Sequence, residues 1–83
     1  MKMYIELYAS LMDLLPPGKE RFRREITVDD TTTVQQVIDR FSISDELAHI
    51  VLVNGNFVCG DDRNDKLLST GDIVSIWPPV AGG

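Results

Sequence analysis

The sequence predicts a small α+β domain in which one amphipathic helix covers one face of a four- to five-stranded sheet. Three features of the 83-residue chain indicate this fold. Two N-terminal stretches alternate between apolar and polar residues, a central stretch repeats its apolar residues at helical spacing, and short apolar runs separated by turn signals follow. The length suits one domain rather than two.

The N-terminal third has the pattern of two strands. Residues 3–9 alternate between two faces, which is typical of a half-buried strand. Residues 22–28 form a second strand whose core face is predicted to carry Phe22, Ile26 and Val28. An arginine interrupts that face, so we expect this strand to begin late or to lie at a sheet edge. The loop between the strands contains two prolines and a glycine, which favours a hairpin.

The central stretch predicts the one clear helix. Its apolar residues fall at positions i, i+3, i+4 and i+7, which places them on one stripe of the helix surface. These residues are Val34, Val37, Ile38 and Phe41. Thr33 and Gln36 have the spacing of a capping box, so we expect the helix to start at Thr33.

The C-terminal third predicts a hairpin and a final strand. Residues 49–60 contain two apolar runs separated by Asn54-Gly55, a strong hairpin signal because both residue types tolerate positive φ. Residues 61–66 are charged and are predicted to form a surface loop. Residues 72–77 alternate and form the last strand.

The net charge of −5 limits the classes of partner. It argues against nucleic acid, because phosphate binding needs a basic face, and against an anionic membrane surface. It suits a basic protein partner. The apolar N-terminus lacks the pattern of a signal peptide and no run approaches membrane-spanning length, so we expect a cytoplasmic protein.

The sequence shows no phosphate-binding loop, metal-ligand cluster or nucleophile–base pair. We expect a structural role for His49, the only histidine, and burial of Cys59, the only cysteine, as a small hydrophobe. Asp61, Asp62 and Asp65 lack the spacing of a calcium-binding EF-hand and are expected to form a solvated turn. We therefore expect no bound metal or cofactor.

The remaining candidate is the ending WPPVAGG. We expect residues 1–77 to form the domain and residues 78–83 to form a flexible tail that is mobile from about Val80 onward. Glycines lack side chains and can pass through a narrow channel, so the carboxylate of Gly83 becomes the group delivered to a partner. Adenylation with ATP, followed by attack of a sulfur donor, would convert this carboxylate into a thiocarboxylate. The threading residues are Pro78, Pro79, Val80, Ala81 and Gly82.

Three motifs resemble the ubiquitin-like β-grasp sulfur carriers: LVNG at residues 52–55, GD at residues 71–72 and PPVAGG at residues 78–83. The closest resemblance is to the small subunit of molybdopterin synthase, and the thiamine-pathway carrier is more distant. The resemblance implies a mixed sheet in which the first and last strands are parallel neighbours. It also implies that an adenylating enzyme of the ubiquitin-activating type consumes ATP to activate Gly83. A sulfurtransferase would supply the sulfur, and the large synthase subunit would receive the tail. The protein would then be a carrier and co-substrate rather than an enzyme.

Two departures from the family pattern leave the pathway open. The loop at residues 59–69 is longer and more charged than in molybdopterin synthase small subunits, and Trp77 stands where the family usually has phenylalanine. The alternatives are a carrier for thiamine or another thiolation pathway, and a ubiquitin-like modifier joined to its targets through Gly83.

Aromatic residues are predicted to form the partner interface. The alternation of the first and last strands turns Tyr4, Tyr8 and Trp77 away from the core. These strands are neighbours in the β-grasp fold, so the three rings should share the outer face of the sheet. Phe57 matches a contact position of the family and joins the predicted interface. Grouped aromatic residues suit an interface better than a solvated surface.

Overall fold

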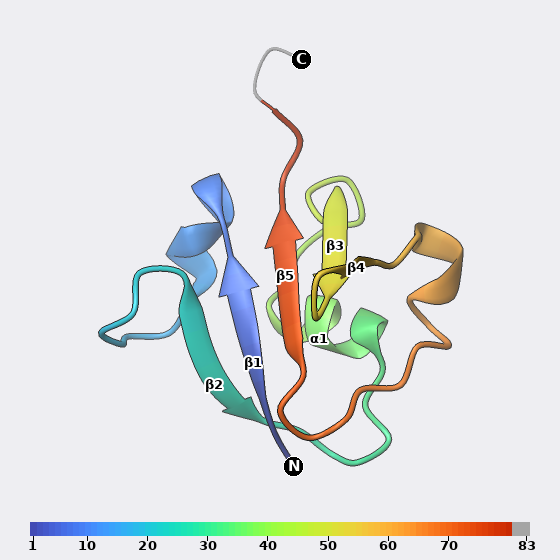
Figure 1. Ribbon diagram of the computed structural model, residues 1–83. Helices are drawn as coiled ribbons and strands as arrows, with labels where there is room; N and C mark the ends of the chain where they lie inside the picture. Colours follow the sequence, from blue (N-terminus) through green and yellow to red (C-terminus); the bar gives the residue numbers. More distant parts are fainter. Residues whose placement is uncertain (81–83) are drawn as a thin grey trace.

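The computed structural model describes residues 1–80, which form one mixed sheet with a single α-helix packed on one face (Figure 1). The strands lie in the order β2-β1-β5-β3-β4. Their bounds are Lys2–Leu7 for β1, Arg23–Thr27 for β2, Ile50–Val53 for β3, Asn56–Phe57 for β4 and Ile73–Trp77 for β5. The helix α1 spans Val34–Arg40, and two short 3-10 helices, η1 and η2, span Ala9–Leu14 and Gly60–Asp62. The predicted α+β architecture is confirmed.

The central pair of strands, β1 and β5, is parallel, whereas the other neighbouring pairs are antiparallel. Tyr4 of β1 lies opposite Ile73 of β5, and Leu7 lies opposite Ile76. The mixed sheet implied by the family resemblance is therefore confirmed. Because β5 pairs with β1 on one side and with β3 on the other, the last strand occupies the middle of the sheet (Figure 1).

Alternate residues of the central strands and the stripe of α1 form the core between sheet and helix. The side chains with no exposed surface include Met3, Ile5, Leu7, Val34, Ile38, Val51, Val74 and Ile76. Burial of each such side chain contributes about 1.5–3 kcal/mol relative to exposure. Phe41, the last residue of the predicted stripe, is only partly buried because α1 ends at Arg40.

The start of α1 is a capping box, as the sequence predicts. The backbone N–H of Gln36 donates to Thr33 Oγ1 over 3.2 Å, and the backbone N–H of Thr33 donates to Gln36 Oε1 over 2.9 Å. The first bond satisfies the N–H of Gln36, which no carbonyl of the helix reaches, and the second satisfies the N–H of the capping residue Thr33.

The loop at residues 60–66 also caps α1. Backbone N–H groups of Val34 and Gln35 donate to the carbonyls of Lys66 and Arg63 over 3.0 and 2.9 Å. The prediction of a solvated loop holds for the three exposed aspartates but is wrong for Arg63, which is buried with 7% of its surface exposed. The charged composition of the loop predicted full exposure to solvent. Its backbone carbonyls instead accept hydrogen bonds from the N–H groups at the start of α1, and these bonds hold the loop against the helix.

Two further burial predictions are wrong. Phe22 does not join the core, because β2 begins one residue later and its alternation does not govern the Phe22 side chain. Cys59 is exposed rather than buried, because β4 ends at Phe57 and Cys59 lies beyond it. The thiol donates to Asp62 Oδ2 over 3.1 Å.

The predicted late start and edge position of β2 are both confirmed. Arg24 donates from its guanidinium to the carbonyls of Pro16, Glu20 and Arg23. Because two of these carbonyls belong to the preceding loop, the arginine that interrupts the apolar pattern fastens this loop to the sheet edge.

The turn between β3 and β4 requires positive φ, as predicted: φ is 51° at Asn54 and 85° at Gly55. We expect Gly55→Ala to lower the free energy of unfolding by about 1–2 kcal/mol, since a Cβ disfavours this backbone conformation. A Cβ at Gly55 would meet no atom within 4 Å, so the effect isolates backbone strain. Gly60→Ala is the matched control, because Gly60 is equally open and has no positive φ. Chemical denaturation that finds equal stability for both variants would contradict the strained turn.

Candidate functional site

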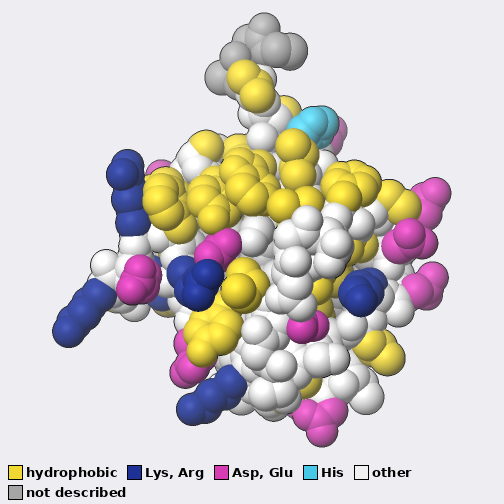
Figure 2. All heavy atoms as spheres, in the orientation of Figure 1, with side chains coloured by type: hydrophobic (Ala, Val, Ile, Leu, Met, Phe, Trp, Pro, Cys, Tyr) yellow, Lys and Arg dark blue, Asp and Glu magenta, His cyan; other side chains and the backbone are white. Residues whose placement is uncertain are grey.

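The outer face of the sheet, opposite α1, is the face shown in Figure 2. A band of hydrophobic side chains crosses this face just below the point where the tail leaves the sheet. The strand register places Tyr4, Ile73 and Leu52 on this face with Trp77. No helix of residues 1–80 covers it, so these side chains form an open face of the sheet, on which Trp77 lies next to the base of the tail.

Three aromatic rings, Phe22, Tyr8 and Trp77, form a stack, which we call the aromatic stack. The rings of Tyr8 and Trp77 are nearly parallel, with centroids 4.3 Å apart and an interplanar angle of 2°. The ring of Phe22 lies against Tyr8, with centroids 5.0 Å apart. Offset or stacked aromatic pairs contribute about 0.5–1.5 kcal/mol beyond the area they bury. Tyr8 is therefore held by an aromatic partner on each side.

Backbone hydrogen bonds fix the stack at the end of β5. The N–H of Tyr8 donates to the carbonyl of Ile76 over 3.2 Å, and the N–H of His49 donates to the carbonyl of Trp77 over 3.1 Å. The ladder thus continues to the last residue of β5, and Pro78 follows directly.

The structure brings together two of the four predicted interface residues, Tyr8 and Trp77. Tyr4 lies on the same face but outside the stack, with the guanidinium of Arg23 5.5 Å from its ring centroid. Phe57 pairs with Leu52 at the opposite edge of the sheet and is 63% exposed. Whether these residues contact a partner stays a prediction.

Sequence reasoning missed two residues that lie next to Tyr8 and Trp77. Phe22 was assigned to the core, and Ile50, which lies opposite Trp77, was not singled out. Strand alternation could have identified Ile50. Its neighbour Val51 faces the core, so Ile50 must lie on the outer face of the sheet. No periodic signal marked Phe22, because it precedes its strand.

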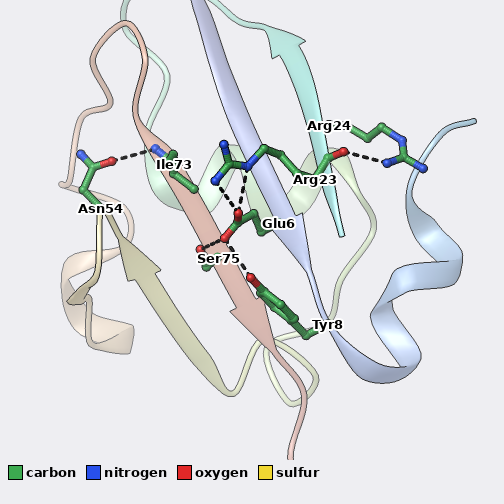
Figure 3. A network of polar contacts seen from close by, with 7 residues as sticks. All are labelled: Glu6, Tyr8, Arg23, Arg24, Asn54, Ile73 and Ser75. Atoms are coloured by element: carbon green, nitrogen blue, oxygen red, sulfur yellow. Dashed lines mark hydrogen bonds and ion pairs between the residues drawn. The ribbon is translucent and has the colours of Figure 1, made fainter. Parts of the chain in front are cut away.

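A polar network lies beside the aromatic stack, centred on Glu6 (Figure 3). The carboxylate of Glu6 accepts hydrogen bonds from Tyr8 Oη, Arg23 Nε and Ser75 Oγ over 2.9, 2.9 and 2.8 Å. Arg23 Nη2 lies 2.8 Å from Glu6 Oε2 and completes an ion pair. The sequence did not reveal this network, because it depends on the strand register that places Arg23 and Ser75 opposite Glu6 on the two neighbouring strands.

The network changes the proton affinity of two groups. Burial acts to raise the pKa of Glu6, but the hydrogen bonds from Arg23, Ser75 and Tyr8 outweigh it, so the pKa lies below its usual value of 4.5. Burial and the bond to the Glu6 carboxylate raise the pKa of the Tyr8 phenol above 10.0. Tyr8 thus stays protonated at neutral pH. Its hydroxyl donates a hydrogen bond to the Glu6 carboxylate, and this bond fixes the orientation of the ring within the stack.

We expect the network to stabilise the fold at neutral pH and to lose this effect in acid. Folding lowers the pKa of Glu6, so the ionised carboxylate stabilises the folded state. This contribution to the free energy of unfolding is complete above the usual pKa of 4.5 and is lost as the pH falls through the lower pKa of the folded state. Glu6→Gln should therefore lower the free energy of unfolding at pH 7, and the difference from wild type should shrink below about pH 4.5. Glu25→Gln is the control, since Glu25 is exposed and pairs only loosely with Lys2 at 4.0 Å. Denaturation across this pH range that shows a constant difference for Glu6→Gln would refute the assignment.

The structure describes the first three predicted tail residues. Pro78 is half-buried, whereas Pro79 and Val80 are exposed, Val80 to 82%. Three predicted site residues, Ala81, Gly82 and Gly83, lie outside the described residues. The predicted mobility of the tail from about Val80 onward falls mainly on them and stays a prediction.

Within residues 1–80, no helix is long and apolar enough to span a membrane. In the same part of the chain, no three or more His, Cys, Asp or Glu residues are grouped as ligands for a metal ion.

Comparisons with known proteins identify the family. The sequence matches the ThiS family over residues 5–83. No curated protein matches it. Among solved structures, the HVO 2177 protein of Haloferax volcanii has a TM-score of 0.74 and 29% identity, with 100% of this chain and 87% of that chain covered. Small archaeal modifier protein 1 of H. volcanii has a TM-score of 0.68 and 20% identity, with 95% and 98% covered.

A third similar chain comes from the complex of subunits 1 and 2 of the molybdopterin-converting factor from Helicobacter pylori. Its TM-score is 0.59 and its identity is 17%, with both chains covered completely. At identities near 20% these last two likenesses establish the fold alone. The family match covers the chain from β1 through the tail, so this protein belongs to the ThiS family and has the ubiquitin-like β-grasp fold of the sulfur carriers.

Proposed function

We propose that this protein is a sulfur carrier whose Gly83 carboxylate is adenylated and then converted to a thiocarboxylate. The observation that carries the proposal is the match to the ThiS family, which extends through residue 83. In the proposed reaction, the carboxylate attacks the α-phosphorus of ATP and pyrophosphate leaves. Hydrosulfide then attacks the acyl carbon, AMP leaves, and loss of the remaining sulfur-bound proton gives the thiocarboxylate.

The chain itself acts as carrier and co-substrate in this proposal, and it needs no bound cofactor. An adenylating enzyme of the ubiquitin-activating type consumes the ATP, and a sulfurtransferase delivers the sulfur. The aromatic stack, Tyr4 and Phe57 form the surface on which these partners dock, and the two prolines favour an extended backbone at the base of the tail. Tyr8 is held by both Glu6 and Trp77, so little side-chain entropy is lost when a partner covers it.

The proposed pathway is molybdopterin synthesis, with the large synthase subunit as acceptor of the sulfur. The similarity to a chain of the H. pylori complex of subunits 1 and 2 supports this choice. A second candidate function is protein modification, in which Gly83 forms an isopeptide with a target. The similarity to small archaeal modifier protein 1 favours this alternative.

The test is intact-mass spectrometry after incubation with the adenylating enzyme, ATP and a sulfur source. A carrier gains the mass that accompanies replacement of one carboxylate oxygen by sulfur. A modifier instead forms covalent adducts with lysine-containing proteins when lysate is added. Absence of both products would refute the assignment of Gly83. A pull-down from native lysate then tests the pathway, because the large synthase subunit should copurify.

A further inference from the structure

The strand β2 lies at one edge of the sheet, and no strand of residues 1–80 pairs with its free side (Figure 1). At one end, the N–H of Val28 donates to the carbonyl of Met1 over 2.9 Å. At the other end, the N–H of Leu7 donates to the carbonyl of Phe22 over 3.0 Å. Successive residues of an antiparallel strand direct their main-chain groups to alternate sides. The residues whose N–H and carbonyl groups point away from β1 are therefore Arg23, Glu25 and Thr27.

Arginine side chains occupy two of these three outward carbonyls. Arg24 Nη1 donates to the carbonyl of Arg23 over 2.7 Å (Figure 3), and Arg40 Nη1 donates to the carbonyl of Thr27 over 2.7 Å. Arg24 Nε also donates to the carbonyl of Pro16 over 2.6 Å, which holds the preceding loop beside the same end of β2. Arg40 is the last residue of α1 and reaches the other end of β2 from the helix. Two segments that are distant in sequence thus supply the same kind of contact to one sheet edge.

We propose that Arg24 and Arg40 block the free edge of β2 against pairing with a second copy of this chain. A strand that added to β2 would have to displace these charge-assisted hydrogen bonds before it could form its own. An edge without such protection is a template for association. The other edge strand, β4, is only two residues long and offers little main chain for pairing. The proposal does not rest on the sulfur-carrier function.

The charge pattern of β2 makes a second copy the strand that suits this edge. Arg23 and Glu25 lie on the outer face of the sheet, where β1 places Glu6 and Tyr4 opposite them. When two β2 strands meet antiparallel, Arg23 of one copy can lie opposite Glu25 of the other, and twofold symmetry forms this pair twice. This register needs the outward carbonyl of Arg23, which Arg24 occupies, and the one of Thr27 further along the strand, which Arg40 occupies.

Sedimentation velocity of the full chain tests the block. The double variant Arg24→Met/Arg40→Met lacks both sets of donors and should dimerise at least tenfold more tightly than wild type. Arg40→Met alone should do so at least threefold more tightly. Each substitution makes the net charge of −5 more negative, which opposes association, so the gain cannot come from reduced repulsion. Lys19→Met is the charge-matched control: Lys19 is exposed, and the two occupied carbonyls accept from the arginines instead, so its mass should equal that of wild type.

Amide hydrogen exchange identifies the surface that associates. In the dimer of the double variant, the N–H groups of Arg23 and Glu25 should become protected, because the second β2 strand gives them acceptors. Adding Glu25→Lys to the double variant should abolish the dimer, since it places a cation opposite Arg23. Association through the outer face would leave both amides unprotected.

Three results would overturn the proposal. The first is equal association of Arg40→Met and wild type, and this exposed single variant decides the matter if the double variant does not fold. The second is a dimer that forms without protection of the Arg23 and Glu25 amides or that survives Glu25→Lys. The third is a wild type that already pairs through β2, because the arginines would then block nothing.

Discussion

Removal of Gly83 is expected to abolish thiocarboxylate formation while leaving the fold intact. In the truncated chain the terminal carboxyl moves back by one residue, or about 3.3–3.6 Å along an extended tail. A misplacement of about 1 Å can already cost about a hundredfold in rate, so the shifted carboxyl should not react measurably. The fold should survive because the core lies in residues 3–76.

Val80→Ala is the matched control for this deletion. Val80 is 82% exposed and lies in the same tail, but its substitution preserves the length of the chain. The control should still gain sulfur when it is incubated with the adenylating enzyme, ATP and a sulfur source. Intact-mass spectrometry that detects sulfur on the truncated chain would rule out Gly83 as the acyl site.

Trp77→Ala is expected to weaken binding to both the adenylating enzyme and the acceptor subunit by about thirtyfold, equivalent to about 2 kcal/mol. The substitution removes the large ring at the base of the tail and frees Tyr8 on one side. Tyr8→Ala and Phe57→Ala should cost less. Phe57 in particular lies on the edge strand β4 and is 63% exposed, and rim contacts contribute little affinity.

Leu14→Ala is the control for this interface. Leu14 is 42% exposed, but it lies in η1 and lines a pocket with Ile26 and Phe41 that includes no residue of the aromatic stack. Its substitution should leave both affinities unchanged. Titration calorimetry that finds a folded Trp77→Ala variant binding both partners as tightly as wild type would show that the outer face is not the docking surface.

The sequence predicted the regular elements because their patterns are local. Alternation identified the buried faces of β1 and β5, and the spacing of Thr33 and Gln36 located the start of α1. Asn54-Gly55 identified the hairpin because the turn needs positive φ at both residues.

The predictions failed where periodicity ends or where distant strands meet. Phe22 and Cys59 lie just outside strands, so alternation does not control their side chains. Arg63 is drawn inward by its backbone bond to the helix start, which composition cannot reveal. The Glu6 network needs the register of three strands, and this register becomes visible only in the folded chain.

The central position of β5 has a mechanical consequence for the proposed delivery of the tail into a partner. A pull on Pro78 acts along β5 and loads its hydrogen bonds to β1 and β3 together, in shear, rather than opening them one after another. The bonds at Ile76 and Trp77 carry this load up to the last residue of the strand. A tail attached to an edge strand such as β2 or β4 would share the load with one neighbour only. The fold can therefore bear tension on its C-terminal segment from the strand best anchored to resist it.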